Sequence, residues 1–137
     1  MTQVFATVDS IIVVKNQVLL IKRGKNPYIG HWAFPGGRIE HTDKDILDAA
    51  YRELKEETSI SNVTLEYVKT IGNSSRDPRG FCITCIFMCI LDEIPSNICA
   101  MDDAVAFKWF DLHDLPTMAF DHKDILTNLI IDKGLCI

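Results

Sequence analysis

The sequence has no long hydrophobic run and no excess of basic residues, and each absence excludes a class of protein. No apolar stretch approaches the roughly 18–20 residues that cross a bilayer, so we expect no membrane partner. The formal net charge of −5 disfavours non-specific binding to nucleic acid or to anionic membrane surfaces. No basic region precedes the apolar residues of the N-terminus, which therefore predict a first strand of the mature chain rather than a signal peptide.

The chain also lacks a paired cysteine framework. Its cysteines number 5, an odd count that is typical of free thiols in a reducing cytosol, so we expect a cytoplasmic protein. Three of them lie in FCITCIFMCILD, a run rich in β-branched and aromatic residues that predicts a buried strand. Cys82 and Cys85 would point to opposite faces of that strand and could not hold one metal ion together. We therefore interpret these cysteines as core thiols.

The length and composition predict one domain spanning 1–137. The hydrophobic fraction of 47% is enough for a core, and the chain is too short for two domains with a core each. The sequence pattern predicts strands at 4–14, 18–22, 63–71, 81–91 and 105–110. It predicts a hairpin turn at 15–17, a long loop at 23–35, and helices at about 43–58 and 121–132. Strands and helices in this order indicate an α/β (α+β) fold in which helices pack on a mixed sheet.

The first predicted helix carries a group of carboxylates. Ile46, Ala50 and Leu54 recur every four residues and form one apolar stripe. At about 100° per residue, an adjacent arc holds three glutamates: Glu53, Glu56 and Glu57. Glu57 falls at the edge of the face that must be buried, where a carboxylate without a partner is costly.

A divalent cation would resolve this conflict, because Mg²⁺ prefers oxygen ligands. The alternative is a solvated acidic face paired with Arg52 and Lys55, which suits an exposed glutamate but not one at the buried edge. Upstream, Gly36 and Gly37 can adopt conformations that let the main chain approach a ligand or a metal closely. The spacing between these glycines and the glutamates favours the metal hypothesis.

That spacing resembles the Nudix box. The resemblance is carried by Gly37, Glu40, Arg52-Glu53-Leu54, Glu56-Glu57 and Ile60, and by the lead-in His31-Trp32-Ala33-Phe34-Pro35-Gly36-Gly37. It implies a Nudix-type α/β/α sandwich with a mixed central β-sheet and the box helix packed on it. It also implies metal-dependent hydrolysis of a pyrophosphate bond, with Mg²⁺ or Mn²⁺ as the cofactor. The implied metal ligands are Glu53, Glu56, Glu57 and the carbonyl of Gly37.

The sequence departs from the box near both ends of the helix. Asp43 stands where the box has a glutamate, and an extra residue is expected at the junction near Lys44. Thr42 with Asp45 could still cap the helix start. At the other end, Ser59 replaces a glycine, and a left-handed conformation there would cost about 1–2 kcal/mol. These changes leave all three glutamates in place.

Further segments resemble the bacterial ADP-ribose pyrophosphatase branch: Ile21-Lys22-Arg23-Gly24, Arg76-Asp77-Pro78-Arg79-Gly80, Trp109-Phe110, Leu115-Pro116 and Ala119-Phe120-Asp121-His122. The implied reaction converts ADP-ribose to AMP and ribose 5-phosphate. Two alternatives stay open: a house-cleaning hydrolase of modified nucleoside triphosphates, and a module that binds ADP-ribose without cutting it. We expect a small-molecule nucleotide as partner, no nucleic acid and no DNA-binding extension; the oligomeric state is open, with a homodimer as one option.

The candidate substrate-binding residues are basic or aromatic: Arg23, Trp32, Arg76 and Arg79. An arginine can grip a phosphate in bidentate fashion, and Trp32 could stack on adenine. For each single arginine, a surface ion pair is the competing interpretation. Phe34 suits the core better than a stacking role.

Three further roles concern charged residues. Arg52 belongs to the catalytic group, and its direction on the helical wheel favours an orienting ion pair over substrate contact. The general base is open between Glu53 and a loop carboxylate, Asp102 or Asp103. Asp121 is interpreted as the cap of the last helix.

Overall fold

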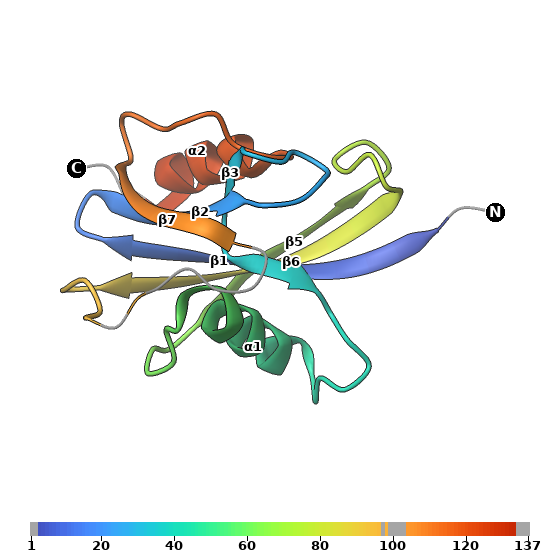
Figure 1. Ribbon diagram of the computed structural model, residues 1–137, viewed down its shortest axis with the longest axis horizontal. Helices are drawn as coiled ribbons and strands as arrows, with labels where there is room; N and C mark the ends of the chain where they lie inside the picture. The colour runs from blue at the N-terminus through green and yellow to red at the C-terminus, as the bar shows by residue number, and fades with distance from the viewer. Residues whose placement is uncertain (1–2, 97, 99–103, 134–137) are drawn as a thin grey trace.

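The computed structural model of the protein describes residues 3–96, 98 and 104–133. Its sheet has seven strands: β1 (Val4–Val14), β2 (Gln17–Arg23), β3 (Trp32–Ala33), β4 (Gly36–Arg38), β5 (Glu66–Asn73), β6 (Phe81–Leu91) and β7 (Ala104–Asp111). The helices of the described part are α1 (Ile46–Thr58) and α2 (His122–Lys133). Figure 1 shows α1 on one side of the sheet and α2 on the other, which confirms the expected α/β/α sandwich.

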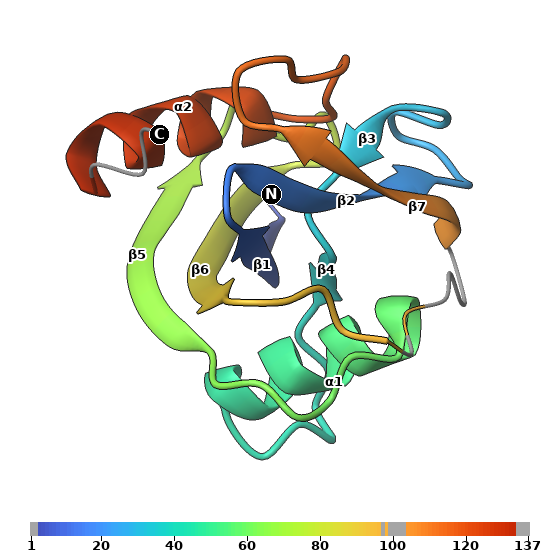
Figure 2. The ribbon, with the colours of Figure 1, turned by 90° about the vertical axis from the view of Figure 1, so that its left-hand side faces the viewer.

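The central strand β1 has three partners. Along one edge it runs parallel to β6 over its whole length. Along the other edge it pairs antiparallel with β4 in its first half and with β2 at its end. The sheet therefore forks beside β1, and Figure 2 shows β4 on the α1 side and β2 towards α2.

Side chains alternate along the strands and fill two cores, one under each helix. Ile11 of β1 packs with Leu126 in the cluster under α2. Val8 points the other way and packs with Leu54 in the cluster under α1. Because β1 contributes to both cores, it is buried from Thr7 to its end, and its position relative to both helices is fixed.

The predicted order of strands and helices is confirmed, but some bounds differ. The short strands β3 and β4 lie at the end of the predicted loop and at the glycine pair that follows it. The predicted start of the first helix at 43 is wrong, because α1 begins at Ile46 after the N-cap Asp45, whose side chain accepts from the N–H of Asp48. The stripe on α1 is also shorter than predicted, since Ile46 is 45% exposed.

The buried cysteines of β6 are free thiols on two faces of the strand. Cys82 contacts the Thr7 hydroxyl and the Arg76 guanidinium, whereas Cys85 packs in the cluster under α1. The prediction that Cys82 and Cys85 point to opposite faces is confirmed. Among the described residues, no helix is long and apolar enough to cross a membrane.

Candidate active site

The glutamates of α1 face a hollow beside β4, which we call the outer pocket. Its lining includes Glu40, Glu53, Glu56, Glu57 and the two glycines of β4. Ala49, Ala50 and Leu54 of the helix pack into the core, and the glutamates lie beside this buried face, on the side towards β4. The structure thus gathers the three predicted glutamates and Gly37 in one place.

Glu57 is buried, as predicted, and is only 6% exposed. Its Oε1 accepts a hydrogen bond from the backbone N–H of Gly36 at 2.6 Å. Such a bond offsets part of the cost of removing the carboxylate from water. The need for a partner was therefore predictable, and the backbone of β4 is one partner that the sequence did not reveal.

The glycines of β4 are needed because the strand lies close to its neighbours on both sides. A Cβ atom at Gly36 would collide with the carbonyl oxygen of Val8 on β1. One at Gly37 would lie 2.5 Å from Oε2 of Glu53. Any side chain at position 37 would therefore displace a candidate metal ligand.

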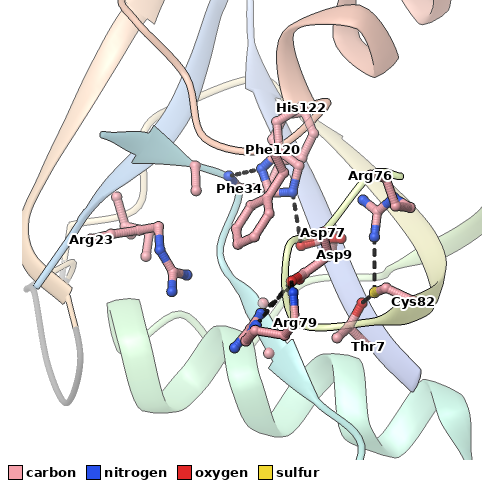
Figure 3. A pocket seen from close by; sticks show the side chains of 14 residues that line it. Thr7, Asp9, Arg23, Phe34, Arg76, Asp77, Arg79, Cys82, Phe120 and His122 are labelled. Carbon is pink, nitrogen blue, oxygen red and sulfur yellow. Dashed lines mark hydrogen bonds and ion pairs between the residues drawn. The ribbon is translucent and has the colours of Figure 1, made fainter. Parts of the chain in front are cut away.

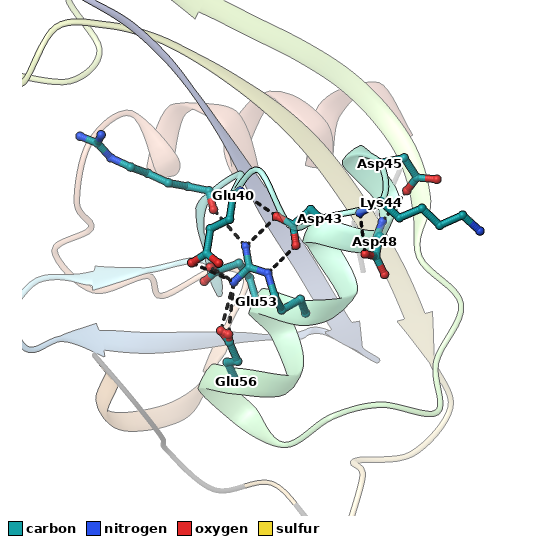
Figure 4. A network of polar contacts seen from close by, with 9 residues as sticks. Glu40, Asp43, Lys44, Asp45, Asp48, Glu53 and Glu56 are labelled. Atoms are coloured by element: carbon teal, nitrogen blue, oxygen red, sulfur yellow. Dashed lines mark hydrogen bonds and ion pairs between the residues drawn. The ribbon is translucent and has the colours of Figure 1, made fainter.

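Arg52 links the loop before α1 to the glutamates. Figure 4 labels its partners Asp43, Glu53 and Glu56. Its Nε and Nη2 donate to the two carboxylate oxygens of Asp43 at 2.6 and 2.9 Å. Its Nη1 donates to Glu53 at 2.7 Å and to Glu56 at 3.0 Å. The Arg52 guanidinium lowers the pKa of Asp43 to about 2, and the pKa of Arg52 is raised in turn, chiefly by Asp43. Asp43 thus supplies the ion pair of Arg52, in spite of the extra residue nearby.

Burial raises the pKa of Glu53 above its ordinary value. The hydrogen bond from Arg52 opposes this shift, and the nearby Glu56 and Glu40 carboxylates add to it. A partly buried carboxylate beside other carboxylates is stabilised by added positive charge. The outer pocket therefore favours a cation.

The donor set of the outer pocket fits a divalent metal ion. Glu53, Glu56 and Glu57 offer hard carboxylate oxygens in one hollow, next to the backbone of Gly37. In the described ranges, no three His, Cys, Asp or Glu side chains are already gathered closely enough to hold a metal. Glu53 and Glu56 instead share the Arg52 guanidinium, which supplies part of the positive charge that they require.

A second hollow, the inner pocket, lies at the fork of the sheet (Figure 3). Its own lining includes Asp9, Phe34, Cys82, Phe120 and His122. The two pockets share a wall made by Thr7, Arg23, Gly36, Gly37 and Arg79. They therefore form one continuous site, with an acidic part beside α1 and a second part lined by residues of β2 and α2.

Two of the predicted substrate-binding arginines lie on that shared wall. The Arg23 side chain donates from Nε to the carbonyl of Pro27 at 2.7 Å and lies over the Phe120 ring. Arg79 pairs with Asp77 at 2.8 Å and also lies over Phe120, with its Cζ 5.8 Å from the ring centre. Although burial opposes the change, the hydrogen bond from Arg79 lowers the pKa of Asp77.

The other two predicted substrate-binding residues, Arg76 and Trp32, are not on the shared wall, although Arg76 lines the inner pocket. Arg76 is buried; it pairs with both oxygens of Asp121 and donates to the sulfur of Cys82 at 3.0 Å. Trp32 packs edge-on against Phe110, with 4.8 Å between the ring centres, and does not line either pocket. The two candidate bases at 102 and 103 lie outside the described residues.

Asp9 and His122 are residues of the site that the sequence reasoning missed. His122 is 3% exposed, and its Nδ1 accepts from the N–H of Phe34 at 3.1 Å. Its Nε2 lies 3.6 Å from Oδ1 of Asp9. The sequence held one signal for Asp9, which is the charged residue of a largely apolar strand.

Comparison with known proteins agrees with this geometry. The model of the NUDIX domain matches residues 5–129 of the chain. The chain belongs to the Nudix family. This Nudix protein is 42% identical to the ADP-ribose pyrophosphatase of Methanocaldococcus jannaschii, over 87% of its own length and 69% of that enzyme. With this relative, the family match places the chain among the Nudix-type pyrophosphohydrolases.

Solved structures support the same assignment. The bifunctional NMN adenylyltransferase/ADP ribose pyrophosphatase of Francisella tularensis, complexed with AMP and a Mn ion, superposes with a TM-score of 0.85 and 33% identity. The match covers 96% of this Nudix chain and 42% of that protein. The NUDIX domain of Shewanella oneidensis NrtR, in a cocrystal with ADP ribose, has a TM-score of 0.86 and 27% identity over 99% of this chain and 91% of that one.

A regulator is also related to the chain. The ADPR responsive transcriptional repressor of Acinetobacter baylyi is 34% identical over 80% of this chain, but the match spans only 45% of the repressor. The chain therefore corresponds to less than half of that relative.

Proposed function

We propose that this Nudix hydrolase cleaves the pyrophosphate bond of ADP-ribose to give AMP and ribose 5-phosphate. The observation that carries the proposal is the wall that the two pockets share, where Arg23 and Arg79 lie between the carboxylates of α1 and the inner pocket. ADP-ribose consists of two uncharged ends joined by a diphosphate. With one end in the inner pocket, its diphosphate would lie beside the arginines and the carboxylates.

Glu53, Glu56 and Glu57 would hold Mg²⁺ or Mn²⁺, with the carbonyl of Gly37 as a further ligand. Such an ion would neutralise charge on the phosphate oxygens and lower the pKa of a bound water. Arg52 orients Glu53 and Glu56 by hydrogen bonds to both. Among the described candidates for the general base, Glu53 has a pKa raised by burial, which makes its carboxylate a stronger base than an exposed glutamate.

The names of the relatives support this substrate. The relative from M. jannaschii is named an ADP-ribose pyrophosphatase, and the S. oneidensis domain holds ADP ribose. The F. tularensis enzyme was crystallised with AMP, the proposed product, and with a Mn ion. The A. baylyi repressor is responsive to ADPR, which favours binding without cleavage as the second candidate function.

One assay tests these proposals. The protein is incubated with Mg²⁺ and separately with ADP-ribose, NADH, diadenosine polyphosphates and nucleoside triphosphates, and the products are separated by chromatography. We expect AMP and ribose 5-phosphate from ADP-ribose, loss of both when the metal is chelated, and recovery with Mg²⁺ or Mn²⁺. Release of pyrophosphate from nucleoside triphosphates, with no product from ADP-ribose, would instead indicate a hydrolase of modified nucleoside triphosphates. Binding of ADP-ribose without turnover would establish a sensor.

A further inference from the structure

The floor of the inner pocket holds a buried carboxylate with spare capacity to accept hydrogen bonds. Asp9 is 6% exposed and lines the pocket. Its Oδ2 accepts from the Thr84 hydroxyl at 2.6 Å. Its Oδ1 lies 3.6 Å from Nε2 of His122, which is too long for a good hydrogen bond. Since a carboxylate has about four acceptor sites, Oδ1 can accept from a ligand.

The neighbours of Asp9 hold the carboxylate in one orientation. His122 accepts the N–H of Phe34 through Nδ1, so the neutral imidazole carries its proton on Nε2, the nitrogen that faces Asp9. Thr84 is completely buried and fixes the other carboxylate oxygen. Asp9 is thus a preorganised acceptor rather than a mobile side chain.

Two of the arginines that line the inner pocket pair with other carboxylates. Arg76 pairs with Asp121 at 2.7 Å, and Arg79 pairs with Asp77 at 2.8 Å. Within the part of the chain that the structure describes, Asp9 has no ion pair with a guanidinium. A phosphate at the pocket floor would be repelled by this carboxylate, whereas an uncharged N–H or O–H group would be bound.

We propose that Asp9 is a specificity-determining residue that accepts a hydrogen bond from an uncharged donor at the end of the substrate seated in the inner pocket. The inference rests on the proposed function. On ADP-ribose, the donor is the 6-amino group of adenine or a hydroxyl of the terminal ribose, and both present the same chemistry to a carboxylate. The contact directs an uncharged end inward and leaves the diphosphate at the shared wall with Arg23 and Arg79.

The test compares kcat/KM for three compounds in the wild type and in Asp9→Asn. The compounds are ADP-ribose, its counterpart with unsubstituted purine, which lacks the 6-amino group, and an analogue whose terminal sugar lacks its hydroxyl groups. We expect the wild type to prefer ADP-ribose over one analogue by about 10- to 100-fold, because a buried acceptor rejects a ligand that lacks the donor. That analogue identifies the donor. Asp9→Asn should reduce the preference to within about threefold, since it replaces a negatively charged hydrogen-bond acceptor with a neutral amide.

Matched variants at Thr84 keep the test decisive if Asp9→Asn does not fold. Thr84→Val removes the hydrogen bond to Oδ2 and should weaken the preference, whereas Thr84→Ser retains the hydroxyl and should preserve it. Circular dichroism and thermal unfolding verify the fold of each variant. A folded Asp9→Asn protein with the wild-type preference would overturn the inference.

If the proposed function is wrong, the wild-type protein yields no AMP from ADP-ribose. The same preference is then measured as a ratio of dissociation constants by calorimetry. Equal affinity of the wild type for all three compounds, or no binding, would overturn the role of Asp9, and a preference that is lost in Asp9→Asn would support it.

Discussion

Arg52 is the residue that ties the acidic part of the site together. It binds Asp43 through two N–H groups and contacts Glu53 and Glu56 through a third nitrogen. The resulting arrangement holds two candidate metal ligands at the same side of α1. At the scale of single residues, the arrangement of the carboxylates therefore depends on the Arg52 guanidinium as well as on the glutamates themselves.

Glu56 gives the direct test of the metal assignment. Replacement of Glu56 by Gln removes one negative charge and keeps the shape, so we expect turnover with Mg²⁺ to fall at least about 100-fold, the size of an electrostatic contribution to catalysis. Glu66→Gln on the exposed face of β5 is the matched control and should retain activity. Activity close to wild type in Glu56→Gln would refute the metal assignment.

Asp43 should act on catalysis through Arg52 alone. Asp43→Asn weakens the bidentate pair, so Arg52 would orient Glu53 and Glu56 less well, and we expect kcat to fall about 10-fold, as for the loss of an outer partner of a metal ligand. KM for ADP-ribose should change little. The exposed Asp92→Asn serves as the control. Unchanged kcat in a folded Asp43→Asn protein would remove the orienting role.

Some residues of the site were predictable and others were not, for a physical reason. The glutamates, the glycine pair and the burial of Glu57 follow from local spacing on one helix and its lead-in. The ion pair of Asp121 could not be predicted in this way, because its partner Arg76 lies 45 positions earlier in the sequence. Asp121 was interpreted from its position as a helix cap, and in the fold both of its carboxylate oxygens bind this distant guanidinium.

At the scale of elements, both ends of α1 differ from the family pattern. The helix begins after Asp45, which leaves Asp43 in the preceding loop, where it reaches Arg52. It ends at Thr58, and its C-cap Ser59 has a φ of 67°, the left-handed conformation for which the sequence predicts a cost. Local sequence therefore predicted the cost of a left-handed serine at the end of the helix. The residue at which the helix begins depended on which acidic side chain caps it and which one pairs with Arg52.

The exit of α1 offers a test of that strain. Ser59→Gly should stabilise the protein by about 1 kcal/mol, because relief of the left-handed strain exceeds the added flexibility of glycine in the unfolded chain. The hydrogen bond from the N–H of residue 59 to the Lys55 carbonyl is kept. Urea denaturation measures the change.

The neighbouring serine provides the control for this prediction. Ser61 is exposed and is not among the residues with positive φ, so Ser61→Gly should be neutral or slightly destabilising. Equal effects of the two substitutions would mean that the backbone at position 59 contributes no strain.

At the scale of the whole molecule, His122 connects α2 to the sheet. It binds the N–H of Phe34 before β4, stacks on the Phe34 ring and faces Asp9 on β1. Burial lowers the pKa of His122 below its ordinary value of 6.5, and the nearby Arg76 and Arg23 act in the same direction. The carboxylates of Asp9 and Asp121 oppose the shift without reversing it. The fold therefore favours the neutral form of this histidine.

This histidine should make stability depend on pH. Below about pH 6.5 the unfolded chain binds a proton at His122 that the folded protein does not, so the free energy of unfolding should fall as the pH drops from 7 to 5. Above pH 7 both states are neutral at this position and the contribution is constant. His122→Gln should flatten the dependence, whereas the exposed His113→Gln should leave it unchanged. Chemical denaturation at several pH values measures the slopes, and equal slopes in His122→Gln and wild type would contradict the assignment.

The fork beside β1 also bears on how the protein reaches its native state. Asp9 and its partner Thr84 are separated by 75 positions, and β1 joins β6 through parallel pairing along its whole length. Contacts between such distant segments form slowly, because a long loop must close before they yield any stabilisation. The helix α1 is local and can form early, but its glutamates have no opposing wall until β1 has aligned β4, β2 and β6. In refolding, the helical signal should therefore return before the capacity to bind nucleotide.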